Sequence, residues 1–242
     1  MQLFRNLGSA LLDLLLPPRC HICRTVIDRS GALHICNDCY SRLPFISSPV
    51  CSICGVPFSG VGNDHPCGSC LTDPPHYSAA RAALAYEGSC RDLIHAFKYS
   101  GRSHLRRPLG LLTAQQLAFY AAQCAPDILL PVPLHKKRLR MRGFNQAVLL
   151  GEVLSSAWHI PLLRQALIRT RWTTPQVELD RNNRLHNLKG AFSVTNPAAI
   201  AGKRVLLVDD VVTTGSTLRE CAGTLLKAGA ADVFAVSVAH AP

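Results

Sequence analysis

The sequence is poor in acidic and in aromatic residues. It has 15 Asp and Glu against 26 Lys and Arg, a formal net charge of +11, and 6% aromatic residues. Such a basic chain favours a polyanionic or phosphorylated partner, although few aromatic side chains are available to stack on bases. Because 48% of the residues are hydrophobic, global disorder is excluded. The length of 242 residues allows one medium domain and a smaller module.

A convincing targeting or membrane-spanning segment is also missing. Residues 1–16 are apolar with one Arg, but Asp13 interrupts the run and no small-x-small cleavage site follows. Leucines at helical spacing predict instead an amphipathic helix over residues 1–19 that docks on the protein, with a membrane-surface role as the less favoured alternative. No other apolar run is long enough to cross a bilayer.

Neither of the common nucleotide-binding loops occurs in the sequence. Gly-x-Gly-x-x-Gly is absent, and no loop carries the Lys of a Walker motif. A different candidate lies at residues 205–218, VLLVDDVVTTGSTL. Its first four residues predict a buried parallel strand. Asp209 and Asp210 then stand at the carboxyl end of that strand, where ligands bind in open α/β sheets, and they suit ribose hydroxyls or Mg²⁺.

A loop rich in hydroxyl groups follows the acidic pair and leads into a predicted helix. The unpaired N–H groups and the positive dipole end of a helix start form a phosphate site, and Gly215 allows close backbone approach. In the alternative interpretation the aspartates merely cap a strand, which leaves an unneutralised acidic pair unexplained. The predicted phosphate ligands are Thr213, Thr214, Gly215, Ser216 and Thr217.

Eight of the eleven cysteines form four Cys-x-x-Cys pairs. The spacing within residues 20–39 recurs within residues 51–70, at an offset of 31 residues. Two such pairs make a tetrahedral site, so we predict two structural Zn²⁺ sites in a module over residues 20–73. Disulfides would require an oxidising compartment, and the repeat favours sequential over cross-braced ligation. The predicted ligands are Cys20, Cys23, Cys36, Cys39, Cys51, Cys54, Cys67 and Cys70.

Predicted strands and helices alternate in the remaining chain, residues 76–242. This alternation predicts an α/β fold with a parallel sheet and helices on both of its faces. The expected strands are 79–86, 127–132, 162–168, 204–209 and 232–239. The expected helices are 89–99, 104–123, 145–157 and the segment after 216.

Further segments of this region are rich in cations. Residues 131–146 carry alternating arginines, which suit an extended segment that offers guanidinium groups to phosphate. Residues 169–187 are long and polar, as an active-site lid would be. Around Lys98, an ordinary helix C-terminus is the competing interpretation. The predicted contacts to nucleic acid or pyrophosphate are Lys98, Arg138, Arg140 and Arg142, and Arg171 is a predicted catalytic residue beside the acidic pair.

Together these motifs resemble the ComF/GntX family of competence-associated, phosphoribosyltransferase-like proteins. The resemblance covers nearly the whole chain. It implies a type I phosphoribosyltransferase fold that binds 5-phosphoribosyl 1-pyrophosphate (PRPP) with Mg²⁺, in which Asp209 and Asp210 contact the ribose hydroxyls. It rests on the double Cys₄ module, FKY at 97–99, PVPLH at 131–135, RGFNQ at 142–146, RTR at 169–171 with Gln176, VDD at 208–210 and TTG at 213–215.

The biological role of this family is the use of imported DNA, in natural transformation or as a nutrient. The resemblance therefore implies a cytoplasmic, PRPP-binding protein that meets incoming single-stranded DNA, whose phosphates suit a basic chain. One alternative is a phosphoribosyltransferase that salvages a base or nucleotide. Another is a non-catalytic adaptor whose zinc ribbons dock on a helicase or DNA-uptake protein. The sequence shows neither a base-recognition pocket nor a clear general base, so it leaves turnover and the acceptor open.

Overall fold

A computed structural model describes residues 17–27, 31–172 and 188–241. Residues 1–16 of the predicted N-terminal helix and residues 173–187 of the predicted lid lie outside these ranges, and residues 17–19, which end the predicted helix, are not helical. The chain forms two compact units, divided between Leu43 and Pro44. Within the described part of the first unit, the N–H of His21 donates to the carbonyl of His34 (2.9 Å), and a short helix, α2 (Asn37–Ser41), follows.

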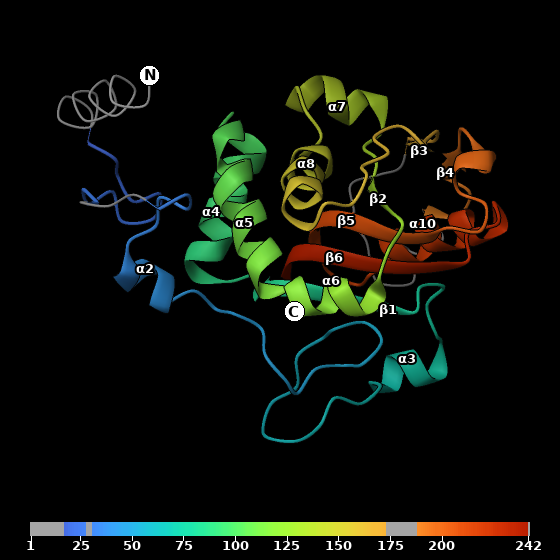
Figure 1. Cartoon of the computed structure of the whole chain (residues 1–242), viewed down its shortest axis with the longest axis horizontal. Helices are drawn as coiled ribbons and strands as arrows, with labels where there is room; N and C mark the ends of the chain where they lie inside the picture. The colour runs from blue at the N-terminus through green and yellow to red at the C-terminus, as the bar shows by residue number, and fades with distance from the viewer. Residues whose placement is uncertain (1–16, 28–30, 173–187, 242) are drawn as a thin grey trace. The chain divides into compact units, whose positions relative to one another are not determined.

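A parallel sheet forms the centre of the second unit (Figure 1). In the described part of this unit, four strands lie in the order β1-β6-β5-β2. Leu206 of β5 is paired with Leu129 of β2 on one side and with Phe234 of β6 on the other. The predicted α/β class is thereby confirmed. The strands are β1 (Ala79–Ala85), β2 (Ile128–Pro131), β5 (Arg204–Val212) and β6 (Asp232–His240).

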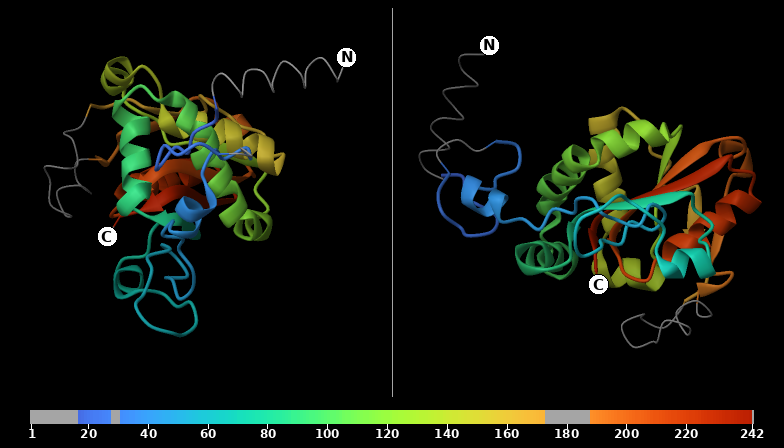
Figure 2. Two further views of the ribbon diagram at one scale, coloured as in Figure 1. Left: turned by 90° about the vertical axis from the view of Figure 1, so that its left-hand side faces the viewer. Right: turned by 90° about the horizontal axis from the view of Figure 1, so that it is seen from below.

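Helices cover both faces of the sheet (Figure 2). Successive side chains of a strand point to opposite faces. Val205 and Leu207 of β5 pack in one cluster with Leu225 of α10. Leu206 therefore faces the other side, where α5 and α8 pack against each other. The helices are α3 (Gly68–Thr72), α4 (Gly88–Tyr99), α5 (Arg106–Gln116), α6 (Ala118–Cys124), α7 (Lys136–Arg142), α8 (Gln146–Trp158) and α10 (Ser216–Lys227), with 3₁₀ helices η1 (Ser103–Leu105) and η3 (Pro197–Ala199).

Two sequence predictions about these elements were wrong. The single helix expected over residues 104–123 is divided into η1, α5 and α6, because the buried Leu117 leaves the helical conformation (φ −105°, ψ 15°) and turns the chain. The strand expected over 162–168 does not join the parallel sheet. Leu162 makes only an isolated bridge to Leu129, and β3 (Leu167–Arg169) pairs antiparallel with β4 (Phe192–Val194) in a separate sheet.

The second cysteine cluster belongs to the unit that contains the sheet. Its residues lie along β1, which is an edge strand. The N–H of Ala80 donates to the carbonyl of Ile53 (2.7 Å), and Arg81 Nη1 donates to the carbonyl of Ser52 (3.1 Å). An uncovered edge strand would offer unpaired backbone groups to other chains. This part of the chain therefore covers the edge while it holds four of the cysteines.

The close approach of the cluster to β1 depends on Gly55. This residue has φ +74°, and a Cβ atom there would lie 2.4 Å from the carbonyl oxygen of Ala80. We expect Gly55→Ala to lower the free energy of unfolding by roughly 2–3 kcal/mol, since both backbone strain and a steric clash are introduced. Thermal or denaturant unfolding would measure the change.

Gly68→Ala is the matched control in the same cluster. A Cβ atom at Gly68 meets no atom within 4 Å, so its effect should stay within about 0.5 kcal/mol. Equal stability of the two variants would contradict the packing of residues 51–55 on β1.

Candidate functional site

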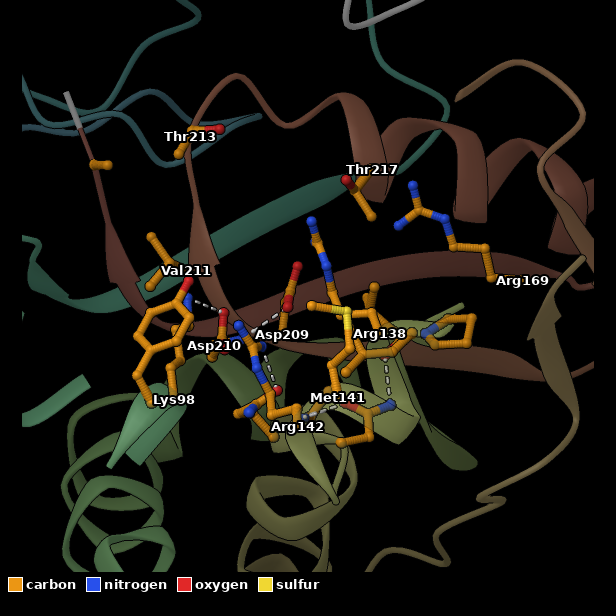
Figure 3. A pocket seen from close by; sticks show the side chains of 18 of the residues that line it. Lys98, Arg138, Met141, Arg142, Arg169, Asp209, Asp210, Val211, Thr213 and Thr217 are labelled. Atoms are coloured by element: carbon orange, nitrogen blue, oxygen red, sulfur yellow. Dashed lines mark hydrogen bonds and ion pairs between the residues drawn. The ribbon is translucent and has the colours of Figure 1, made fainter. Parts of the chain in front are cut away.

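A cavity of about 700 Å³ lies at the carboxyl ends of β2 and β5 (Figure 3). Val132 and Pro133 follow β2 into this cavity, and Asp209 and Asp210 enter it from β5. Further walls are formed by the ends of α4 and α7 and by the starts of α8 and α10. Ligands of open α/β sheets bind at this edge. The cavity therefore coincides with the position that the acidic pair predicted for a ligand.

The two carboxylates of the acidic pair have different partners. As neighbours in a strand, they point to opposite faces of the sheet. Asp210 Oδ1 lies 2.9 Å from Lys98 Nζ at the end of α4, and the two side chains are 12% and 16% exposed. Asp209 Oδ1 accepts a hydrogen bond from the N–H of Asp210 (2.8 Å). Lys98 is thus on one side of the acidic pair and Arg138 on the other (Figure 3).

These surroundings shift the pKa values of Asp209 and Lys98. Burial, together with the neighbouring Asp210 carboxylate, raises the pKa of Asp209 to about 7. Burial alone would lower the pKa of Lys98, but Asp210 and Asp209 raise it above its ordinary value. Lys98 is therefore charged at neutral pH and Asp209 is close to its titration point. A cation or a hydrogen-bond donor brought by a ligand would favour the ionised form of Asp209.

The hydroxyl loop, residues 213–217, joins β5 to α10. Thr213 and Thr217 line the cavity, whereas the hydroxyls of Thr214 and Ser216 hydrogen-bond each other (2.8 Å). Gly215 is the N-cap residue of α10 with φ 71°. Because Gly215 has no side chain, it does not cap the first N–H groups of the helix. These N–H groups and the positive end of the helix dipole form a binding site for an anion.

The basic segment after β2 was predicted to be extended, and this prediction was wrong. Residues 136–142 form α7, which starts where the N–H of Lys137 donates to His135 Nδ1 (3.2 Å) and ends at Gly143 with φ 82°. Side chains four residues apart share one face of a helix. Arg138 and Arg142 consequently both line the cavity, while Arg140 does not.

Arg142 is held in place by two neighbours. Its guanidinium carbon lies 5.0 Å from the centre of the Tyr99 ring, and Nη1 donates to Gln146 Oε1 (2.8 Å). Asn145 is the N-cap residue of α8, with Oδ1 accepting from the N–H of Ala147 (3.0 Å). The start of α8 therefore supports the cationic wall formed by α7.

Arg171, expected beside the acidic pair, does not line the cavity. Its Nη2 donates to the carbonyl of Lys189 (2.8 Å). Arg169, the last residue of β3, lines the cavity instead. The two-residue period of an extended segment places Arg169 and Arg171 on the same face, so the sequence alone could not choose between them. The cavity is also lined by Tyr86 and Met141, which sequence reasoning did not assign to the site, and by Asn145, Gln146 and Trp172.

Eight cysteines form two separate clusters within the described residues, Cys20–Cys23–Cys36–Cys39 and Cys51–Cys54–Cys67–Cys70. In each cluster the sulfur atoms lie within 4.8 Å of one another. The pairs are therefore sequential and not cross-braced. Four thiolates at this separation suit a closed tetrahedral zinc site without an open position for chemistry.

Backbone N–H groups favour the thiolate form of one buried cysteine in each cluster. Cys51 Sγ accepts from the N–H groups of Cys54 (3.4 Å) and Cys67 (3.2 Å). Burial alone would raise the pKa of Cys51, but these N–H groups lower it to about 6. In the first cluster, Cys20 Sγ accepts from the N–H of Cys36 (3.4 Å). Both clusters thus fit a resident Zn²⁺ ion.

Comparison with known proteins identifies two domain types. A double zinc ribbon domain matches residues 11–71, and a phosphoribosyl transferase domain matches residues 148–242. DNA utilization protein YhgH of Shigella flexneri is 37% identical over 163 residues, which are 66% of this chain and 71% of that protein. Competence protein F of Haemophilus influenzae is 36% identical over 158 residues, covering 62% and 67%. Competence protein ComFC of Bacillus subtilis is 31% identical over 156 residues, covering 62% and 59%.

Metal analysis of the purified protein should find two zinc ions per chain, one for each cysteine cluster. Replacing Cys20 and Cys23 by Ser should remove one ion, and replacing Cys51 and Cys54 should remove the other, because each cluster is closed by itself. Elemental analysis by mass spectrometry would measure the ratio. A metal-free protein with disulfide bonds, or a double variant that loses both ions, would contradict the two-site assignment.

Proposed function

Because the chain belongs to the ComF/GntX family of competence and DNA-utilization proteins, we propose that it binds PRPP and supports the use of imported single-stranded DNA. The observation that carries the proposal is the meeting of the acidic pair, the hydroxyl loop and the arginines of α7 around one cavity. Within the described part of the chain, no helix is both long and apolar enough to cross a membrane. Thiolate zinc sites suit a reducing compartment, and we propose that the protein acts in the cytoplasm.

The parts of PRPP match the parts of the cavity. The hydroxyl loop and the start of α10 receive the 5-phosphate. Asp209 and Asp210 accept hydrogen bonds from the ribose hydroxyls, as carboxylates do. Arg138 and Arg142 face the pyrophosphate. The volume of about 700 Å³ lies in the range of small-molecule sites.

Mg²⁺ would accompany the pyrophosphate and neutralise part of its charge. The donor set fits this ion, since Asp209 and Asp210 supply oxygen atoms at the ligand edge of the sheet. Lys98 already forms an ion pair with Asp210 and neutralises its charge. Asp209 is therefore the carboxylate that responds most to an added cation, because its pKa of about 7 lets a cation displace its proton at neutral pH.

Single-stranded DNA is the proposed macromolecular partner. Tyr99 and Trp172, which are 65% and 39% exposed, both line the cavity. Lys137 Nζ lies 5.5 Å from the centre of the Trp172 ring, as Arg142 lies over Tyr99. Exposed rings beside cations are the elements that bind single strands by stacking and charge. Phe144 packs against Phe97 (5.7 Å between ring centres) and is not part of this surface.

Transfer of the phosphoribosyl group to a base or nucleotide is a second candidate. It is favoured by the position of Arg138 and Arg142, which line the cavity together with the acidic pair. Arg138 and Arg142 would stabilise the leaving pyrophosphate. Release of pyrophosphate from PRPP, with bases or DNA as acceptor, would separate an enzyme from a binding protein.

Isothermal titration should show binding of PRPP with Mg²⁺. The double variant Asp209→Asn, Asp210→Asn should bind roughly 100-fold more weakly, because two charged acceptors of about 1.5 kcal/mol each are lost. Affinity should rise between pH 6 and pH 8, since the Asp209 carboxyl with its pKa of about 7 must lose its proton. The residual binding of Asp209→Asn should depend less on pH.

Asp92→Asn is the matched control for this titration. Asp92 also lies on α4, the helix that carries Lys98, but its side chain is 78% exposed, so the variant should bind like the original protein. Undiminished PRPP affinity in the double variant would refute the assignment of the acidic pair.

Affinity for single-stranded DNA should fall steeply with salt concentration. Arg138→Ala and Arg142→Ala should each weaken binding and reduce the salt slope by about 0.7 for every lost phosphate contact. Arg164→Ala is the control, since this exposed arginine is paired with Glu152 (3.0 Å) and lies outside the cavity. Fluorescence anisotropy would measure both quantities. A flat salt profile would contradict DNA binding and favour the zinc-ribbon adaptor.

A further inference from the structure

The segment that follows the second cysteine cluster contacts α10, the helix that begins at the hydroxyl loop. Asp73 forms a bidentate ion pair with Arg219, in which Nη1 lies 2.6 Å from Oδ2 and Nη2 contacts Oδ1. Arg219 Nη2 also donates to the carbonyl of Pro74 (3.0 Å). The N–H of the same arginine donates to the carbonyl of Gly215 (2.9 Å). Arg219 therefore joins the first turn of α10 to the end of the cysteine cluster.

The next residues of this segment extend the contact along α10. His76 Nδ1 lies 3.3 Å from the carbonyl oxygen of Arg219, and its ring closely covers Gly223. Tyr77 is 5% exposed, and its hydroxyl would lie 3.2 Å from a Cβ atom placed on Gly215. Residues 73–77 thus contact both the hydroxyl loop and the first half of the helix.

The contact with α10 begins three residues after a predicted metal ligand. Cys70 lies in α3, and Asp73 is the C-cap residue of that helix, with its N–H donating to the carbonyl of Ser69 (3.0 Å). In the first repeat the residue 31 positions earlier is Arg42, the C-cap residue of α2. An arginine cannot form the ion pair that Asp73 forms. The connection to the hydroxyl loop is therefore a property of the second cluster.

We propose that Asp73 and Arg219 are positioning residues through which the metal site of the second cluster fixes the hydroxyl loop for phosphate. The first cluster has no such role. This inference rests on the proposed function, in which the hydroxyl loop holds the 5-phosphate. A cysteine module of this size depends on its metal for a fixed shape. When the second cluster loses its metal, α3 and Asp73 are no longer held in place. The N–H groups at the start of α10 must then become ordered when phosphate binds, which lowers the affinity for phosphate.

The test uses the full chain loaded with zinc and compares Asp73→Ala with its counterpart Arg42→Ala. Asp73→Ala should keep both zinc ions, bind PRPP with Mg²⁺ roughly tenfold more weakly, and show faster hydrogen exchange at the amides of residues 213–219. Its affinity for single-stranded DNA should not change, since α7 is untouched. Asp73→Glu should recover most of the PRPP affinity, and Arg42→Ala should match the original protein in every measurement.

A second experiment removes one metal site at a time. The variant Cys51→Ser, Cys54→Ser should lose PRPP affinity and exchange protection of residues 213–219, whereas Cys20→Ser, Cys23→Ser should keep both. If the former variant does not fold, Asp73→Ala with both zinc ions bound decides the question. Unchanged exchange in Asp73→Ala, or equal losses in the two cysteine variants, would overturn the inference. If the original protein does not bind PRPP, the proposed function fails, and hydrogen exchange still decides whether this coupling exists.

Discussion

The parallel pairing of β5 between β2 and β6 is the constraint on which the site depends. It aligns the carboxyl ends of these strands, so that Asp209, Asp210 and the residues after β2 meet at one edge. Burial of the apolar residues of β5 fixes the register, since slippage by one residue would turn every side chain to the other face. The same pairing separates the acidic pair, because adjacent carboxylates face opposite sides of the sheet. Their different environments follow from this separation.

Features that depend on local sequence were predictable. Periodicity predicted the parallel sheet with its flanking helices, and the Cys-x-x-Cys spacing predicted the two clusters that the structure contains. The acidic pair and the hydroxyl loop are contiguous in sequence, so the edge of the sheet at which they lie followed from the order of a strand, a loop and a helix. The position of this part of the site needed no knowledge of long-range contacts.

Features that depend on contacts between distant segments were not predictable. The Lys98–Asp210 ion pair joins residues 112 positions apart, and nothing near Lys98 distinguishes it from a charge at an ordinary helix end. Alternating arginines after β2 suggested an extended segment, but caps at His135 and Gly143 make this stretch helical. Arg169 rather than Arg171 lines the cavity because pairing with β4 decides where β3 ends. The ion pair and the end of β3 were decided by tertiary packing, whereas the helix over residues 136–142 depends on local caps that the alternating arginines did not indicate.

The contact between residues 44–53 and β1 also determines which truncated fragments of the chain keep the edge of the sheet covered. Edge groups of β1 are bonded to this stretch, since Ile46 donates to the carbonyl of Ala83 (3.0 Å) and Ala85 to the carbonyl of Pro44 (2.8 Å). A fragment that starts at Pro44 keeps these bonds, but one that starts after the cysteine repeats leaves the strand open. An open, apolar edge pairs readily with other chains. Residues 44–53 therefore belong to the same structural unit as the phosphoribosyltransferase-like sheet, because they cover its edge.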